Sequence, residues 1–293
     1  MNDVFAALRI HIVAIAACAT VVFGYVFKGE YPIGLALLCG FDWCIVNLLN
    51  RATDVDEDRL NGIAATEIVA RHARVIVWGS LFALVASLVL GFAQLPAPLA
   101  WVRVLFHVLG LGYSFRYVPT PSGMKRFKDL YFLKNGMSAV MFLLSVGAYP
   151  LLGIAAVLRV STVGVVALLL FFFLFELTFE VIYDMRDLEG DRAVGVPTYP
   201  VVHGMKTSVR IVRALCFGSI AVLVLARAGS SVLTRELLMV LAPVAQLGFM
   251  AVRKPEDVTR RDCIGITYAG AAMLVLFLAG TAIWTRAGLP VDF

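Results

Sequence analysis

Residues 47–62 of the chain read NLLNRATDVDEDRLNG, so an apolar run ends in a cluster of acids. Asn50, Asp54 and Asp58 are spaced i, i+4 and i+8, and on a continuous helix these side chains form one stripe on one face. Asp56 would point away from that stripe. Because like charges on one helical face repel each other, the stripe predicts a site that binds a cation.

The composition of the whole chain places this cluster at a membrane. Of the 293 residues, 61% are hydrophobic and 15% are charged, and the mean hydropathy of +0.89 is too high for a soluble domain of this length. Windows of about 18 to 22 almost uncharged residues are long enough to cross a hydrocarbon core of about 30 Å as helices. Nine such windows lie at roughly 9–27, 32–50, 75–93, 97–114, 130–151, 160–183, 208–227, 232–252 and 263–284.

These windows predict an all-α membrane protein with nine transmembrane helices, built as a single domain over residues 1–293. The first window is interpreted as a span and not as a removable signal peptide.

The distribution of Lys and Arg predicts the orientation. Most of the 25 basic residues lie in the connections after the second, fourth, sixth and eighth windows. By the positive-inside rule these connections are cytoplasmic, so the N-terminus lies inside and the C-terminus outside. The net charge of +5 then reflects topology, and we expect no nucleic-acid partner. We expect a multi-pass protein of a bacterial inner membrane, with its acidic clusters and active site toward the cytoplasm.

A second acidic cluster follows the sixth window as the first follows the second. It reads YDMRDLEGDRAVG at residues 183–195, with Asp184, Asp187 and Asp191 spaced i, i+3 and i+7. Mg²⁺ prefers carboxylate oxygens together with waters and substrate phosphates, so two facing stripes would hold Mg²⁺ against a diphosphate. The alternative is that the acids are solvated and paired with neighbouring arginines. Two matched clusters count against that alternative.

The two clusters together resemble the motifs of the UbiA-type intramembrane prenyltransferase superfamily, and the resemblance covers essentially the whole chain. Members have nine membrane helices and two Asp-rich motifs at the cytoplasmic ends of helices two and six. The first family motif is N-D-x-x-D-x-x-x-D, which residues 50–58 match except that Arg51 stands at its second position. The segment DMRDLEGDR is close to the second motif. The resemblance implies a helical bundle around a central cavity that binds Mg²⁺ and a prenyl diphosphate.

The motifs and the resemblance assign candidate site residues. The candidate metal ligands are Asn50, Asp54, Asp58, Asp184, Asp187 and Asp191. The candidate catalytic residues among them are Asp54, Asp184 and Asp187. The candidate substrate contacts are Asn50, Tyr113, Lys125, Arg126, Lys128, Lys134, Asn135, Arg192, Asp42 and Glu180. The basic side chains among these would neutralise charge on the departing diphosphate. The resemblance implies this role, because in the family a Tyr-Ser pair followed by a basic loop helps to hold the diphosphate.

Two of these acids lie deep in predicted spans. Acids at such depth are costly and usually face a cavity or a partner. Asp42 and Glu180 would therefore line an acceptor pocket or stabilise a carbocation. For Asp42, a structural ion pair with Arg103 or His107 is equally open.

The chemistry that fits is ionisation of an allylic prenyl diphosphate, followed by capture of the cation in a cavity shielded from water. We expect transfer to a small acceptor and favour an aromatic one. Terpene cyclisation without any acceptor stays open. A transporter for an ion or an anionic lipid is the alternative from another class, because acids inside a membrane also mark ion pathways.

Overall fold

The computed structural model describes residues 3–290, apart from the side chains of Asp3, Phe132 and Glu256, and most of these residues are helical. The first half of the chain forms α1 (Asp3–Ala7), α2 (Ile10–Lys28), α3 (Ile33–Thr53), α4 (Val55–Leu60), α5 (Thr66–Gln94), α6 (Ala97–Ser114), the strands β1 (Val118–Thr120) and β2 (Gly123–Lys125), and the 3₁₀ helix η1 (Phe127–Asp129). The second half forms α7 (Tyr131–Phe142), the π-helix η2 (Leu143–Ala148), α8 (Tyr149–Gly153), α9 (Thr162–Arg186), α10 (Leu188–Val194), α11 (Tyr199–Ala228), η3 (Thr234–Val240), α12 (Leu241–Val252), η4 (Pro255–Asp257) and α13 (Arg260–Arg286).

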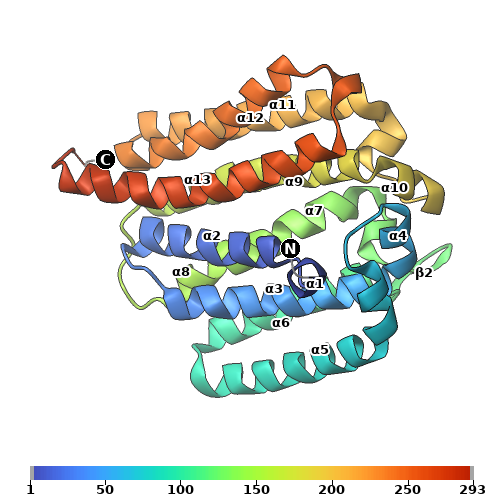
Figure 1. The fold of residues 1–293 in the computed structure, drawn as a ribbon. Coiled ribbons are helices and arrows are strands. Elements are labelled where there is room, and N and C mark those ends of the chain that lie inside the picture. The colour runs from blue at the N-terminus through green and yellow to red at the C-terminus, as the bar shows by residue number, and fades with distance from the viewer. Residues whose placement is uncertain (1–2, 291–293) are drawn as a thin grey trace.

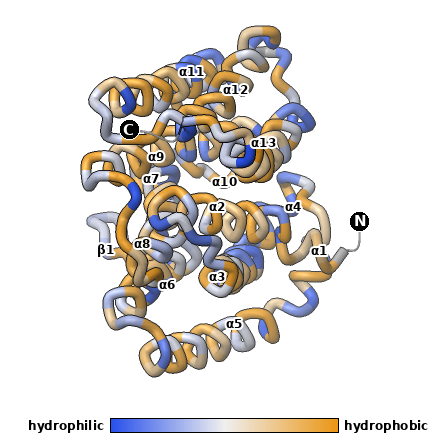
Figure 2. Tube along the Cα trace, turned by 90° about the vertical axis from the view of Figure 1, so that its left-hand side faces the viewer, coloured by the Kyte–Doolittle hydropathy of each residue, from blue (hydrophilic) through white to orange (hydrophobic). Residues whose placement is uncertain are grey.

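The helices match the predicted spans closely. Eight segments of residues 3–290 are long and apolar enough to cross a membrane, and hydrophobic residues dominate their tubes in Figure 2. They correspond to eight of the nine predicted windows. The remaining window is helix α6, which carries the buried side chains of Arg103 and His107. The prediction of an all-α membrane protein is thus confirmed, whereas the count of nine spans and the side on which the N-terminus lies stay predictions.

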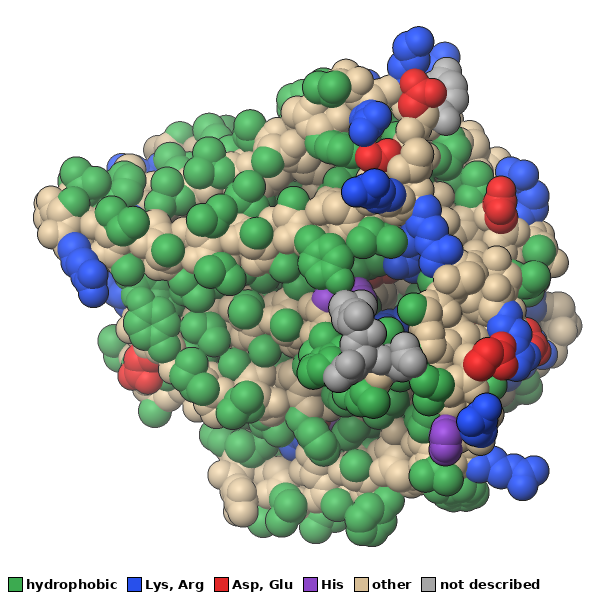
Figure 3. Space-filling model, in the orientation of Figure 1, with side chains coloured by type: hydrophobic (Ala, Val, Ile, Leu, Met, Phe, Trp, Pro, Cys, Tyr) green, Lys and Arg blue, Asp and Glu red, His purple; other side chains and the backbone are tan. Residues whose placement is uncertain are grey.

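The long helices lie side by side in a bundle, and the short elements gather at one end of it (Figure 1). Helix α2 packs against α3 and α13, α3 packs against α5, and α9 packs against α11. The short helices α4 and α10 contact each other and lie at the same end as β2. Most charged side chains visible in Figure 3 lie toward that end, and hydrophobic side chains cover much of the remaining face.

Both acidic clusters straddle a break between two helices. Helix α3 ends at Thr53, and Asp54 has φ −109° and ψ 21° before α4 begins. Helix α9 ends at Arg186, and Asp187 has φ −101° and ψ 11° before α10 begins. The prediction of stripes on continuous helices is therefore wrong. Beyond the breaks, α4 and α10 meet at one end of the bundle.

The basic loop holds a small hairpin that the sequence did not predict. Strands β1 and β2 pair antiparallel, with Val118 opposite Lys125 and Thr120 opposite Gly123. Gly123 has φ 108°, a left-handed conformation that glycine adopts without strain. Pro119 keeps the segment out of a helix. The hairpin leads directly into η1 and α7, which carry the basic residues of the site.

Asp42 is completely buried in a polar network that joins α3, α6 and α8. Arg103 donates to its two carboxylate oxygens from Nε at 2.9 Å and from Nη2 at 2.8 Å. Tyr149 donates its hydroxyl at 2.7 Å, and His107 Nε2 lies 3.1 Å from Oδ1. The predicted ion pair is confirmed. The prediction that Asp42 lines the substrate cavity is wrong, because these partners surround its carboxylate.

Removing this carboxylate should destabilise the bundle. Asp42→Ala leaves the Arg103 guanidinium buried without its counter-ion, so we expect the free energy of unfolding to fall by about 3–5 kcal/mol. The measurement is SDS-induced unfolding in mixed micelles, followed by circular dichroism. Asp56→Ala is the control, because the Asp56 side chain is 92% exposed. Equal unfolding transitions for the two variants would contradict the structural role of Asp42.

Candidate active site

A cavity of about 490 Å³ opens at the end of the bundle where α4 and α10 meet. Its wall comes from α2, α3, α4, α7, α9, α10 and α13, among other elements. The structure brings all six candidate metal ligands to this wall, which are Asn50, Asp54, Asp58, Asp184, Asp187 and Asp191. Besides Asn50, it brings four more of the candidate substrate contacts to the wall, which are Tyr113, Lys128, Lys134 and Glu180.

Asp54 is held by basic side chains from the segment after the hairpin. Arg126 Nη1 lies 2.9 Å and Lys128 Nζ lies 2.7 Å from the same carboxylate oxygen. Lys128 Nζ also lies 2.7 Å from Glu57 Oε2. Residues more than 70 positions apart in the chain thus form one charged cluster, in which Arg126 and Lys128 neutralise the carboxylates of Asp54 and Glu57.

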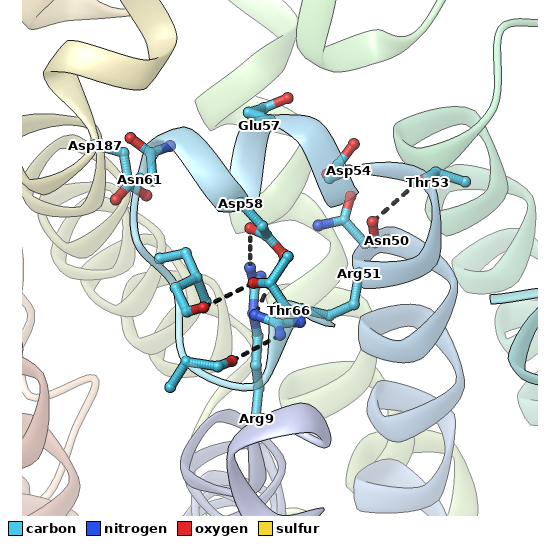
Figure 4. Close-up of polar contacts among 12 residues, drawn as sticks. Arg9, Asn50, Arg51, Thr53, Asp54, Glu57, Asp58, Asn61, Thr66 and Asp187 are labelled. Atoms are coloured by element: carbon cyan, nitrogen blue, oxygen red, sulfur yellow. Dashed lines mark hydrogen bonds and ion pairs between the residues drawn. The ribbon is translucent and has the colours of Figure 1, made fainter. Parts of the chain in front are cut away.

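Asp58 lies between two arginines (Figure 4). Arg9 contacts Oδ1 at 3.2 Å, and Arg51 contacts Oδ2 at 3.2 Å. The Arg51 side chain is completely buried, and its Nη2 donates to the Ala64 carbonyl at 2.8 Å. Arg51, which departs from the family motif, therefore anchors the first cluster by pairing with its last acid.

Helices α4 and α10 are joined through Asn61. Its Oδ1 accepts a hydrogen bond from the Gly190 backbone N–H at 3.1 Å. A Cβ on Gly190 would lie 2.1 Å from that oxygen, so only glycine permits this approach. Asn61 lies beside Asp187 (Figure 4). The hydrogen bond therefore holds the two acidic clusters next to each other.

Lys134 bridges two acids of the second cluster. Its Nζ lies 2.9 Å from Asp184 Oδ1 and 3.0 Å from Asp191 Oδ2. Asn135 donates its amide to the other oxygen of Asp184 at 2.8 Å. Asp187 is paired with the adjacent Arg186, whose Nε donates at 2.8 Å. Consecutive residues of α7 therefore hold the carboxylate of Asp184 from both sides.

Burial changes the protonation of the acids at the end of the cavity. It raises the pKa of Asp54 and of Asp58, and it raises the pKa of Asp191 to about 6. The ionised form of these buried acids is unfavourable unless positive charge lies nearby. A metal ion that binds here therefore replaces either a proton or a basic side chain.

The donor set by itself is incomplete for a metal ion. Residues 3–290 contain no group of three or more His, Cys, Asp or Glu side chains arranged to hold one. Asn50 Oδ1 is buried in the cavity wall without a hydrogen-bond partner among these residues, so one neutral oxygen is free for a cation. Such a site fits Mg²⁺, which takes few protein ligands and completes its shell with water and phosphate oxygens.

Five candidate substrate contacts do not line the cavity, which are Asp42, Lys125, Arg126, Asn135 and Arg192. Arg126 and Asn135 still contact Asp54 and Asp184 of its wall. Successive side chains of an extended segment point in opposite directions, so when Arg126 turns toward Asp54, Lys125 turns away. Arg192 is exposed on α10, whereas its neighbour Asp191 is buried in the cavity wall.

Sequence reasoning missed several residues of the site. Arg9 and Asn61 gave no signal, because their partners lie 49 and 129 positions away. Glu57 lies within the first acidic cluster and could have been included on that ground. His11 and Tyr268 also line the cavity, with ring centroids 5.9 Å apart.

Comparison with known proteins gives a family match over most of the chain. The model of the "UbiA prenyltransferase family" matches residues 12–263. A digeranylgeranylglyceryl phosphate synthase from Thermococcus sibiricus is 29% identical over 199 residues, which are 66% of this chain and 63% of that protein. Its counterpart from Haloquadratum walsbyi is 36% identical over 85 residues, which are 29% of this chain and 28% of that protein. The chain thus matches less than two thirds of the length of either relative.

Solved structures share the fold. A UbiA homolog from Archaeoglobus fulgidus, bound to DMAPP and Mg²⁺, superposes with a TM-score of 0.72 at 18% identity, covering 97% of this chain and 99% of that one. A UbiA homolog from Aeropyrum pernix K1 gives a TM-score of 0.62 at 15% identity, covering 94% of this chain and 98% of that one.

The bridging lysine supplies a test of how cations occupy this site. Lys134→Ala leaves Asp184 and Asp191 facing each other without their shared cation, so the thermal midpoint of unfolding should fall. Mg²⁺ should then raise the midpoint of the variant more than that of the wild type, because it restores the missing charge. The control is Lys125→Ala, at a position that does not line the cavity. An identical response to Mg²⁺ in wild type and Lys134→Ala would contradict this reading of the site.

Proposed function

Because the chain belongs to the UbiA prenyltransferase family, we propose that it transfers a prenyl group from a prenyl diphosphate to an acceptor inside the membrane, with Mg²⁺ as cofactor. The observation that carries the proposal is a cavity with a charged end and an apolar interior. The charged end suits a metal diphosphate, and the apolar interior suits an isoprenoid chain.

The charge of the wall favours the binding of cations. Eight carboxyl groups and five Lys or Arg side chains line the described wall, so the carboxyl groups outnumber the basic side chains by three. An excess of buried negative charge is unfavourable unless further positive charge enters. When bound, Mg²⁺ would supply that charge and stabilise the leaving diphosphate as a Lewis acid.

The protein side chains divide this work. Asn50, Asp54, Asp184 and Asp187 are the proposed metal ligands from the two motifs, with Asp58 and Asp191 held nearby by their basic partners. Lys128 and Lys134 lie on the cavity wall among the acids, so both can turn from carboxylate to diphosphate. Arg126 and Asn135 position Asp54 and Asp184.

The apolar part of the cavity is aromatic. Its wall includes Trp43, Phe23, Phe142, Phe171, Phe172 and Phe277. Phe172 precedes Asp184 by twelve residues on α9, which corresponds to about 18 Å along the helix. An isoprenoid chain anchored at the acids therefore extends along these rings, whose faces also attract a passing carbocation.

The reaction breaks the bond between C1 of the prenyl group and the diphosphate oxygen, and the bonding electrons leave with the diphosphate. A lone pair of the acceptor forms the new bond to C1, and the acceptor proton passes to the diphosphate or to a carboxylate. Glu176 and Glu180 lie in the wall, two and one helical turns deeper than Asp184, where their carboxyl oxygens would face the allylic cation. Ser138 donates to Glu180 at 2.6 Å and fixes its position.

Two classes of acceptor are compatible with this cavity. The small aromatic acceptor favoured by the sequence stays a prediction. The names of the curated relatives support a second class, a glycerophosphate lipid.

The activity is tested with purified protein and prenyl diphosphates of several chain lengths. We expect release of diphosphate that requires Mg²⁺, and a prenylated product by mass spectrometry when either 4-hydroxybenzoate or a prenylated glycerophosphate is present. A cyclic hydrocarbon formed without acceptor would favour the terpene cyclase. If Mg²⁺ causes no release of diphosphate under any condition, the enzyme reading is wrong and a transporter becomes the better account.

The two motifs should contribute together. Asp54→Ala and Asp184→Ala should each lower product formation by at least about 100-fold while the protein stays folded, because each removes charge that faces the diphosphate. Asp56→Ala should stay close to the wild-type rate, since its side chain is exposed and pairs with Arg59 at 3.0 Å. Equal losses at positions 54 and 56 would exclude the proposed arrangement.

A further inference from the structure

A groove of about 530 Å³ lies between α9, α12 and α13. Ala245, Gly265 and Ala269 line it and are exposed, and all three belong to candidate membrane spans, so the groove opens toward lipid. Phe175 and Phe179 line both this groove and the cavity of the acidic clusters. Their side chains separate the two spaces, and nothing in the proposed prenyl transfer uses the groove.

One buried polar side chain in the groove has no partner. Gln246 on α12 is 5% exposed, and neither its Nε2 nor its Oε1 makes a hydrogen bond with any described residue. A buried amide without partners is unfavourable, and the hydrocarbon core of a bilayer offers no water to satisfy it. Gln246 therefore favours a ligand that brings a hydrogen-bonding group to this depth.

The groove carries positive charge at one end. Arg253, Arg261 and Asp262 line that end, and both arginines are exposed. Arg253 pairs with Asp262 at 3.3 Å, so the charge of Arg261 is left without a partner among the lining residues. Arg253 follows Gln246 by seven residues, which corresponds to about 10 Å along a helix. A ligand that reaches both is charged at its head and polar below it.

This basic end lies at the same end of the bundle as the acidic clusters. Arg260, at the start of α13, donates to the Asn61 and Gly62 carbonyls next to α4. Charged side chains gather toward that end, as expected where helices leave a bilayer (Figure 3). Basic pockets between membrane helices at such an interface bind the heads of anionic lipids.

We propose that the groove binds one anionic phospholipid of the surrounding bilayer, which is not a substrate. Its phosphate lies at Arg253 and Arg261. Its ester oxygens lie deeper, where Gln246 donates to one of them, and an acyl chain lies along Phe249 and Met273. The lipid thereby covers, from the bilayer side, the side chains that separate the groove from the cavity.

A second copy of the chain is the other occupant that small exposed residues would suit. The charges count against it. In a symmetric pair whose axis runs along the bilayer normal, the arginines of the two copies would lie at the same depth and repel each other. Asp262 offers no relief, because it is already paired with Arg253 of its own chain.

Substitutions separate the parts of this site. Gly265→Leu fills the space of the acyl chain, since a Cβ there meets no atom within 4 Å. Its matched control is Gly248→Leu, at an exposed α12 glycine whose Cβ also meets nothing within 4 Å and which lines neither space. Arg261→Gln removes one charge from the head site, with Arg71→Gln on the exposed surface of α5 as its control. Gln246→Leu removes the polar contact at similar volume.

Native mass spectrometry of the purified protein in detergent, with equal amounts of phosphatidylglycerol and phosphatidylcholine, measures which lipid is retained. Wild type and both controls should retain one phosphatidylglycerol in preference to phosphatidylcholine. Gly265→Leu should lose that lipid, and Arg261→Gln should lower the preference about fivefold.

Thermal unfolding tests the role of the amide. In lipid-free detergent, Gln246→Leu should unfold at the wild-type midpoint or above it, because it removes an amide without partners. Added phosphatidylglycerol should then raise the midpoint of the variant less than that of the wild type. A midpoint below wild type in lipid-free detergent would overturn the assignment of Gln246 to the lipid.

Equal retention of phosphatidylglycerol by wild type and Gly265→Leu would overturn the site, and so would a wild type without preference between the two lipids. A dimer that Gly265→Leu dissociates would identify a second copy as the occupant and likewise overturn it. Neither measurement requires turnover, so a failure of the proposed prenyl transfer would leave this inference standing.

Discussion

The pairing of buried carboxylates with basic side chains from distant parts of the chain is the constraint on which the site depends. Asp54 is held by Arg126 and Lys128, and Asp184 and Asp191 share Lys134. Ions buried in this way are costly, and losing one partner leaves an uncompensated charge. The ion pairs therefore stabilise the fold, and they hold acids and bases together at the place where the proposed function puts a metal diphosphate.

The membrane fold creates this constraint. Helices α3 and α9 end in acids at the same end of the bundle, and the breaks at Asp54 and Asp187 fold the acids back over the cavity. Arg126 and η1, which follow the hairpin, and α7 then supply the bases. Below them the wall becomes aromatic. The proposed function places a polar reaction at one end of this cavity and an apolar substrate along its axis.

The sequence predicted the helical membrane fold and the positions of the spans, because apolar windows and charged connections are local signals. The spacing of the acids selected six residues that all line one cavity, although the predicted stripes are broken at Asp54 and Asp187. Their role as metal ligands stays a prediction. Pairings such as Arg9 with Asp58 depend on tertiary packing and leave no local pattern. Asp42 was ambiguous because a deep acid signals either a cavity or a partner, and only the position of Arg103 decides between them.

The central claim is that cations and a diphosphate replace the basic partners of the acids together. Calorimetry of a non-hydrolysable prenyl diphosphate analogue, with and without Mg²⁺, tests it most directly. The account predicts weak binding of either alone, and an affinity of each that rises in the presence of the other by the same factor, on the order of 5 to 150-fold. An analogue affinity that is indifferent to Mg²⁺ would contradict it, because the paired acids would then be a structural network and not a diphosphate site.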